Sequence, residues 1–355
     1  MRGNGDDEAP SPSVPRGSQG RLSDSYDAAL LDLDGVVYVG GVPIPGSAQA
    51  LERAASRGMR LAFVTNNASR TPHAIAAQLT GMGIAATATD VVTSAQAAAR
   101  LVAGRFPAGS AVLVSGGTGL RFAVRERGLR PVTTADSRPV AVVQGYSSDL
   151  TYGLLAEAAL AIRAGAWFVA SNMDATLPTT RGPQPGNGSL VQLLITATGQ
   201  QPVVAGKPQP PLHAESVERV GAKRPLIVGD RLDTDIEGAH NGGADSLLVL
   251  TGVTRPAELL LAPSSQRPTY IAADLAGLND THPEVEHTEG GFSCGGWTAR
   301  PGGGWLAVSG SGDPIDGLRA ACAAAWAAGP PQGSDRQQAL DLARSVALQI
   351  KGLDR

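Results

Sequence analysis

Acidic side chains stand directly after two apolar runs of the sequence. Asp32 and Asp34 end the first run, and Asp230 ends a second run, Leu226–Gly229, with Asp235 close behind. Residues two apart on an extended chain face the same way, so Asp32 and Asp34 converge on one pocket. Because several carboxylates at one point repel one another, the pattern favours a divalent cation among them. Mg²⁺ prefers such oxygen ligands together with water and phosphate.

Two further segments supply a hydroxyl group, an amide and a positive charge. Thr65 and Asn66 end an apolar strand, and Lys207 lies in the turn Ala205–Pro208. A metal ion, a lysine and a hydroxyl can together neutralise and hold phosphoryl oxygens, and a carboxylate can then attack phosphorus in line. These residue types therefore predict phosphoryl-group chemistry at a magnesium centre.

The hydrophobic pattern predicts a scaffold that brings such strand ends together. Short apolar strands, among them Arg60–Thr65, Ala111–Val114 and Leu226–Gly229, alternate with helical segments such as Ser47–Arg57 and Tyr152–Ala164. This alternation is typical of an α/β fold with a Rossmann-like, doubly wound parallel sheet. In such a sheet, ligands bind beyond the carboxyl ends of the strands.

Composition excludes several classes of protein. The chain has 355 residues, a formal net charge of -3 and 42% hydrophobic residues. This charge gives no reason to expect nucleic acid or a membrane surface as a partner, and no apolar run reaches the length of a membrane helix. The first residues lack the apolar stretch of a secretory signal, so we expect a cytoplasmic protein.

Four short motifs follow one another along the chain. In order, they are Asp32-Leu33-Asp34-Gly35, Thr65-Asn66-Asn67, Gly206-Lys207-Pro208 and the segment from Gly229-Asp230 to Thr234-Asp235. Together they resemble the motifs of the haloacid dehalogenase (HAD) superfamily. More narrowly, residues 26–280 resemble the family of NagD-type, 4-nitrophenylphosphate and phosphoglycolate phosphatases. The resemblance implies the HAD fold and a phosphoric monoester hydrolase.

The resemblance also implies roles in the reaction. Asp32 would be the nucleophile and form an aspartyl-phosphate, while Asp34 would protonate the leaving group and then activate water. Thr65, the Asn66 backbone and Lys207 would hold the phosphoryl oxygens. Position 34 is Asp rather than Thr, which favours hydrolysis over a persistent phospho-enzyme because a carboxyl group can move protons in both half-reactions.

The metal site follows from the same resemblance. Mg²⁺ would lie between the Asp32 carboxylate, the Asp34 backbone carbonyl and Asp230. Asp235 would orient the metal-bound waters or Lys207 without binding the metal itself.

A long insertion separates Asn66 from Lys207. It predicts an αβ cap of the C2 type at residues 94–194, inserted into a phosphatase core of residues 26–93 and 195–280. Such a cap would cover the phosphate site and contact the leaving group. Within its loop, Asn172 and Asp174 are the predicted substrate contacts, although turn formation explains both residues equally well.

The two ends of the chain differ from this core in composition. Residues 1–25 are rich in Pro, Ser and Gly and predict a disordered tail. Residues 281–355 predict a small C-terminal α+β extension, with a hairpin and two helices, that resembles an acyltransferase-like fragment or a dimerisation element. His282 lies in the linker before it and is expected to be solvated.

The predicted substrate is a small phosphorylated metabolite. A polar cap loop without a bulky aromatic group favours glycerol 3-phosphate, and phosphoglycolate next, over a nucleotide or pyridoxal phosphate, which is the alternative within the enzyme class. An alternative of a different class is a regulatory or scaffold protein with a residual phosphatase core. A homodimer is compatible both with a phosphatase and with a regulatory or scaffold protein.

Overall fold

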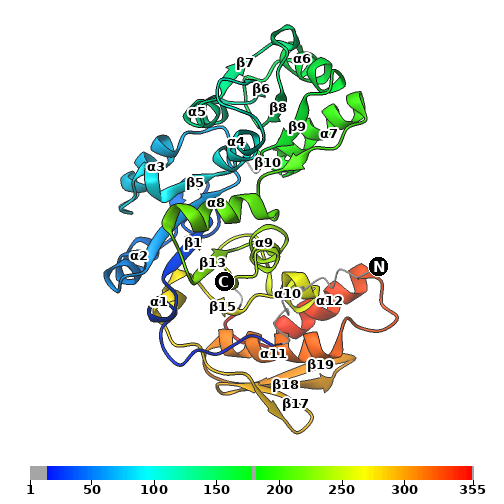
Figure 1. The fold of residues 1–355 in the computed structure, drawn as a ribbon. Coiled ribbons are helices and arrows are strands. Elements are labelled where there is room, and N and C mark those ends of the chain that lie inside the picture. Colours follow the sequence, from blue (N-terminus) through cyan, green and yellow to red (C-terminus); the bar gives the residue numbers. More distant parts are fainter. Residues whose placement is uncertain (1–13, 178–180, 354–355) are drawn as a thin grey trace, which may run out of the picture. The chain divides into compact units, whose positions relative to one another are not determined.

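The structure, a computed structural model, describes residues 14–177 and 181–353 (Figure 1). The chain divides into two compact units. We call one the terminal unit, because it comprises Met1–Val39, Pro43–Arg60 and Arg224–Arg355, and the other the middle unit, which comprises Gly40–Val42 and Leu61–Lys223. The division into core and cap expected from the sequence stays a prediction.

The terminal unit contains parallel strands in the order β15-β14-β13-β1. Their bounds, with those of the helical elements of this part, are α1 Leu22–Ser25, β1 Ala28–Leu31, α2 Ser47–Ser56, β13 Pro225–Gly229, α9 Glu237–Asn241, β14 Asp245–Val249, α10 Pro256–Leu260 and β15 Tyr270–Ala272. A π-helical turn, Leu232–Ile236, and the 3₁₀ turns Ser264–Gln266 and Leu275–Asn279 join them. In β1 and β13, Leu31 lies beside Val228, so Asp32 and Asp230 follow neighbouring strands.

A small α+β region follows this sheet. Antiparallel strands lie in the order β16-β17-β18-β19, and a long helix packs on three of them. The bounds are β16 Glu286–Thr288, β17 Gly291–Cys294, β18 Trp297–Gly302, β19 Trp305–Gly310, α11 Pro314–Ala328 and α12 Arg336–Ala347. The predicted C-terminal α+β extension is confirmed, and its strands form a sheet rather than a single hairpin.

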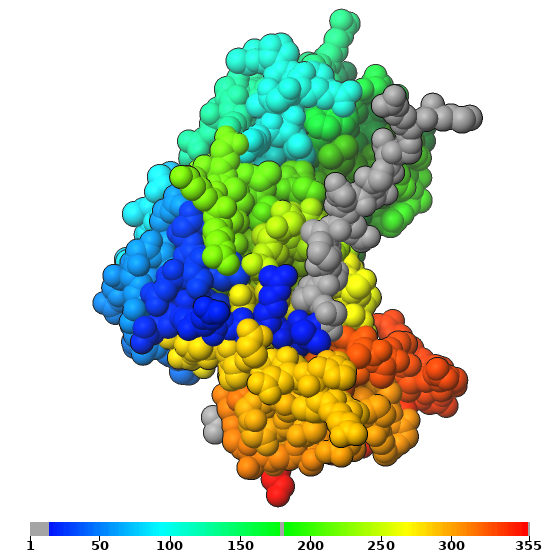
Figure 2. Space-filling model, turned by 60° about the horizontal axis from the view of Figure 1, so that its bottom comes forward, coloured from blue at the N-terminus to red at the C-terminus, as the bar shows by residue number. Residues whose placement is uncertain are grey.

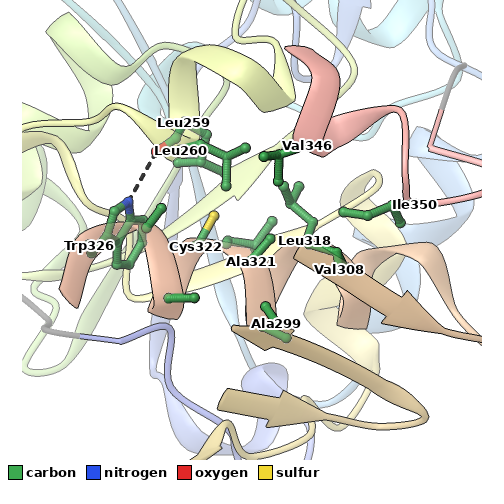
Figure 3. Close-up of a cluster of buried hydrophobic side chains, with 14 of the residues drawn as sticks. Leu259, Leu260, Ala299, Val308, Leu318, Ala321, Cys322, Trp326, Val346 and Ile350 are labelled. Atoms are coloured by element: carbon green, nitrogen blue, oxygen red, sulfur yellow. Dashed lines mark hydrogen bonds between the residues drawn. The ribbon is translucent and has the colours of Figure 1, made fainter. Parts of the chain in front are cut away.

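The extension and the parallel sheet share one hydrophobic core (Figure 3). Leu259 and Leu260 of α10 pack among Leu318 and Cys322 of α11, and the indole N–H of Trp326 donates to the carbonyl of Leu259 at 3.1 Å. Because burial of apolar area is the dominant favourable term in folding, this region is an integral part of the terminal unit.

His282 is buried, so the expectation that it is solvated is wrong. Its side chain lies beside Arg319 of α11, whose Nη2 donates to His282 Nδ1 at 3.0 Å, and its Nε2 lies 2.9 Å from the carbonyl of Gly277. Burial, which is the largest cause, and the charge of Arg319 together lower the pKa of His282 to about 4. A neutral His282 can therefore accept the hydrogen bond from Arg319.

Residues 14–25 fall within the predicted disordered tail, and the structure gives them defined contacts. The Arg16 N–H donates to Thr269 O, the Ser18 N–H donates to His282 O, and Leu22 is fully buried. Figure 2 shows this blue segment beside the yellow residues that precede the C-terminal extension.

The middle unit is also built on parallel strands. β4 pairs with β5, and a further sheet has the order β12-β9-β8-β6-β7. The bounds of its strands are β4 Arg60–Thr65, β5 Val91–Thr93, β6 Ala111–Ser115, β7 Arg130–Val132, β8 Ala141–Gln144, β9 Trp167–Ala170, β10 Thr176–Leu177, β11 Gln184–Pro185 and β12 Val203–Val204. Its helices are α3 Pro72–Gly81, α4 Ser94–Arg105, α5 Thr118–Glu126, α6 Tyr152–Arg163, α7 Asn187–Thr198 and α8 Pro210–Val220. The short strands β2 Tyr38–Val39 and β3 Val42–Pro43 form a separate ribbon.

Local sequence sets the start of α4. The Thr93 hydroxyl accepts the N–H of Gln96, and the Gln96 carboxamide accepts the N–H of Thr93 at 2.9 Å, which is a capping box that satisfies otherwise orphaned donors. The predicted α/β class with parallel sheets is confirmed. Within the described parts of the chain, no helix combines the length and apolar character that a membrane crossing requires.

Candidate active site

The terminal unit holds a cluster of three carboxylates, Asp32, Asp230 and Asp235. One oxygen from each lies within 4.8 Å of the others. Asp32 follows β1, Asp230 follows β13, and Asp235 belongs to the π-helical turn after β13. Asp230 and Asp235 are almost fully buried, so the charges of this group need a cation close by. Three converging hard oxygen ligands fit Mg²⁺.

Backbone groups fix the carboxylate of Asp230. The Val253 N–H donates to Asp230 Oδ2 at 2.6 Å, and the Thr254 N–H donates to the Asp230 carbonyl at 3.1 Å. On the other side Gly35 has φ +89°, and a Cβ there would lie 2.4 Å from Asp230 Oδ2. Only glycine allows both this backbone conformation and this close approach, which explains why the first motif ends in Gly.

Asp34 and Asp235 differ in their surroundings. Asp34 is exposed in the tight turn after β1, where the Gly35 N–H donates to Tyr38 O at 2.7 Å. A carboxyl group in this exposed position can exchange protons with water. Asp235 accepts the Arg231 N–H at Oδ2, 3.2 Å away, while one of its oxygens belongs to the carboxylate cluster.

The middle unit brings together the second and third motifs. The Lys207 N–H donates to Asn66 Oδ1 at 2.8 Å, and Asn66 Nδ2 donates back to the Lys207 carbonyl at 3.2 Å. The ammonium group of Lys207 donates to the Val64 carbonyl at 3.3 Å. Thr65 is buried, and its hydroxyl oxygen accepts the Asn67 N–H at 3.1 Å.

The structure places Asn172 and Asp174 against Asn66. Asn172 Nδ2 donates to the Asn66 carbonyl at 2.7 Å, and Asn66 Nδ2 donates to the two oxygens of Asp174 at 3.2 and 3.3 Å. A role of these two residues in binding the substrate stays a prediction. Sequence reasoning missed Ser94, whose hydroxyl donates to the same carbonyl at 2.6 Å. The capping box of α4 marks this position but gives no sign of what lies opposite.

A buried glutamate anchors α8, the helix that begins shortly after Lys207. Glu215 is 3% exposed and accepts hydrogen bonds from Arg100 of α4, Arg127 after α5 and Arg219 of α8. Burial alone would raise the pKa of Glu215, but the hydrogen bonds and charges of the three guanidinium groups hold it below its usual value. Glu215 is therefore ionised at neutral pH.

Comparisons with known proteins give the family. A haloacid dehalogenase-like hydrolase model matches residues 29–130, and a second HAD-hydrolase-like model matches residues 204–278. A model of a GCN5-related N-acetyltransferase-like domain matches residues 294–353. The chain belongs to the haloacid dehalogenase-like hydrolases, as its motifs predict, and carries an acetyltransferase-like region after the hydrolase part.

Within this family, the chain is similar to proteins that are named as phosphatases. The chain is 47% identical over 316 residues to a D-glycerol 3-phosphate phosphatase of Mycobacterium tuberculosis, covering 86% of this chain and 88% of the relative. It is 38% identical to an acid sugar phosphatase of Staphylococcus saprophyticus over 74% of this chain and 99% of the relative.

A solved structure extends the similarity to the fold. The crystal structure of a glycerol phosphate phosphatase from M. tuberculosis in complex with magnesium matches with a TM-score of 0.83 and 44% identity, covering 94% of this chain and 99% of that one. Coverage of this extent includes most of the C-terminal region. The predicted HAD fold and the predicted class, a phosphoric monoester hydrolase, are confirmed.

Proposed function

We propose that this protein is a Mg²⁺-dependent phosphatase that hydrolyses glycerol 3-phosphate through an aspartyl-phosphate. One observation carries the choice of substrate: the 47% identity to the mycobacterial D-glycerol 3-phosphate phosphatase extends over 86% of the chain. The relative named acid sugar phosphatase covers only 74% of it. The proposal places the enzyme in the cytoplasm, with a small phosphorylated metabolite as its substrate.

In the proposed reaction, Asp32 attacks the phosphorus atom while Asp34 protonates the departing alkoxide. Asp34 then removes a proton from the water that hydrolyses the aspartyl-phosphate. The Thr65 hydroxyl, the Asn66 backbone and Lys207 hold the phosphoryl oxygens. Support comes from the exposure of Asp34 and from the contacts that hold Lys207 beside Asn66.

The cofactor of the proposal is Mg²⁺. Asp32, the Asp34 carbonyl and Asp230 would hold it, and the proximity of an Asp235 oxygen to the carboxylates of Asp32 and Asp230 supports a role for Asp235 beside them. When bound, the ion supplies positive charge that offsets the charge of the phosphoryl oxygens. The cluster of hard oxygen ligands within 4.8 Å is the feature that fits it.

A substrate panel tests the proposal. Phosphate release is measured with Mg²⁺ and glycerol 3-phosphate, phosphoglycolate, a sugar phosphate, a nucleoside monophosphate or pyridoxal phosphate. We expect kcat/KM for glycerol 3-phosphate to exceed the others by about tenfold, which corresponds to about 1.4 kcal/mol of differential transition-state binding. A preference for the nucleotide or for pyridoxal phosphate would replace the proposed substrate by the rival class.

A second experiment tests the intermediate. In Asp34→Asn both the acid for the leaving group and the base that activates water are absent. The substrate is therefore 4-nitrophenyl phosphate, whose phenolate leaves without protonation, and phosphate should remain on Asp32 after incubation with it. Mass spectrometry of the quenched protein would detect the added phosphate. The double variant Asp32→Asn/Asp34→Asn is the matched control and should gain no mass; equal labelling of both variants would refute Asp32 as the nucleophile.

A further inference from the structure

The side chain of Asn66 joins loops that are far apart in the sequence. Its Oδ1 accepts the Lys207 N–H at 2.8 Å, and its Nδ2 donates to the Lys207 carbonyl at 3.2 Å and to the carboxylate of Asp174 at 3.2 Å. Gly206 is part of this arrangement, because a Cβ at that position would lie 2.4 Å from Asn66 Oδ1. The three loops meet on one carboxamide.

The donors and acceptors around Asn66 fit only one orientation of its amide. The oxygen must face the Lys207 N–H, and the nitrogen must face a carbonyl and a carboxylate. Aspartate would lack the donors, and leucine would lack both functions. Because a buried polar group without a partner costs about 1–3 kcal/mol, this matched set stabilises one arrangement of the loops.

The backbone of Asn66 also binds the loop that contains Asn172 and Asp174. Its carbonyl accepts hydrogen bonds from Asn172 Nδ2 at 2.7 Å and from the Ser94 hydroxyl at 2.6 Å. Asn172 in turn accepts the Asp174 N–H through its side-chain oxygen at 3.2 Å. The loop that contains Asn172 and Asp174 is therefore bound to Asn66 at two points.

From these contacts we propose that Asn66 is a positioning residue, which sets Lys207 against the phosphoryl group through its side chain, and that Asp174 acts through Asn66 rather than by contact with the substrate. The inference rests on the proposed function because it assigns Lys207 to the phosphoryl group. It predicts that a change of the hydrogen bond between Asp174 and Asn66 alters the hydrolysis of every phosphate ester, since all share the group that Lys207 holds.

An exchange of the two side chains tests this proposal. Asn66→Asp sets two carboxylates against each other at hydrogen-bond distance, so we expect kcat to fall by about 30-fold with glycerol 3-phosphate and 4-nitrophenyl phosphate alike. The double variant Asn66→Asp/Asp174→Asn restores one donor opposite one carboxylate. Its kcat should be at least about tenfold higher than that of Asn66→Asp. It should stay below wild type, because the Lys207 carbonyl still lacks its donor.

The controls separate positioning from substrate contact. Met173→Ala alters an exposed side chain of the same loop and should leave both rates within about twofold of wild type. If Asp174 contacts the substrate, Asp174→Asn will raise KM for glycerol 3-phosphate only, and the double variant will be no better than Asn66→Asp. That pattern, or wild-type rates in Asn66→Asp, would overturn the proposal.

Thermal unfolding gives a readout that does not depend on the substrate. Asn66→Asp should unfold at a lower temperature than wild type, and the double variant should recover most of the difference. If wild type hydrolyses no phosphate ester, the proposed function fails while this comparison still decides whether residues 66 and 174 interact. If Asn66→Asp does not fold, folding of the double variant supports the proposal, and its failure to fold overturns it.

Discussion

Replacement of Glu215 by Gln removes a buried charge and keeps the shape of the side chain. Glu215 Oε1 accepts hydrogen bonds from the guanidinium groups of Arg127 at 2.8 Å and Arg219 at 2.7 Å. Glu215 Oε2 accepts one from Arg100 at 3.1 Å. In Glu215→Gln one of these oxygens becomes an NH₂ group that faces guanidinium donors. The change therefore removes charge-assisted hydrogen bonds and adds a donor against donors.

The size of the effect follows from the exposure of the partners. Hydrogen bonds to a charged group contribute about 1.5–3 kcal/mol each when both sides are desolvated. Here the three arginine side chains are 27–37% exposed, so water can replace some of the hydrogen bonds that their guanidinium groups lose in the variant. We expect a net loss of about 2 kcal/mol, which corresponds to a decrease in Tm of about 4–8 °C for a cooperative unit of 150–250 residues.

The pH dependence identifies the charge as the cause. The pKa of Glu215 in the folded state lies below its ordinary value of 4.5. The ionised side chain therefore stabilises the folded protein fully above pH 4.5, and this contribution is lost as the pH falls through the lowered folded-state pKa. We expect the Tm difference between wild type and Glu215→Gln to be constant from pH 8 to pH 5 and to narrow below pH 4.5.

Glu218→Gln is the matched control on the same helix. Glu218 also pairs with Arg100, but its side chain is 69% exposed, so its loss should change stability by less than about 0.5 kcal/mol. Thermal unfolding followed by circular dichroism at pH 7.5 and pH 4 compares the three proteins. An equal loss in both variants, or a Tm difference for Glu215→Gln that does not change with pH, would refute the reasoning.

Three further predictions concern the reaction and the C-terminal region. Asp32→Asn should lower kcat by at least about 10³-fold with little change in Tm, since the amide is not a nucleophile; appreciable turnover would remove Asp32 from its proposed role. A chelator of divalent metal should stop phosphate release and excess Mg²⁺ should restore it, and a rate that ignores the chelator would contradict the metal site. Removal of the residues after position 285 should yield aggregated protein by size-exclusion chromatography, because Leu259 and Leu260 lose their cover, and a soluble, active fragment would show that the hydrolase part folds without the extension.

The sequence predicted the parallel α/β class because its signals are local. Apolar strands such as Ala111–Ser115 and helices such as Ser47–Ser56 occur close to where hydrophobic periodicity and a terminal Gly place them. The order of the four motifs sufficed for the family, as the match to haloacid dehalogenase-like hydrolases confirms. The roles assigned to single residues stay predictions.

Other features could not be predicted because they arise between distant segments. His282 looks solvated beside polar neighbours in the sequence, yet it is buried between Arg319 and the carbonyl of Gly277, and this burial and the charge of Arg319 lower its pKa. Glu215 has the appearance of an ordinary surface glutamate in the sequence, but the fold brings Arg100 of α4 and Arg127, which follows α5, to its carboxylate. The spacing of residues along the sequence does not predict contacts between such distant segments.

The sequence by itself determined which chemical groups this protein has and which strand ends carry them: the carboxylates of Asp32, Asp34 and Asp230, the hydroxyl of Thr65 and the ammonium group of Lys207. Tertiary structure alone decided that an oxygen of Asp235 joins the carboxylate cluster and that the amide of Asn66 faces both Lys207 and Asp174. The physical reason is range. Motifs and periodicity depend on neighbours within a turn or a strand, whereas burial and hydrogen-bond pairing depend on which distant segments the folded core brings together.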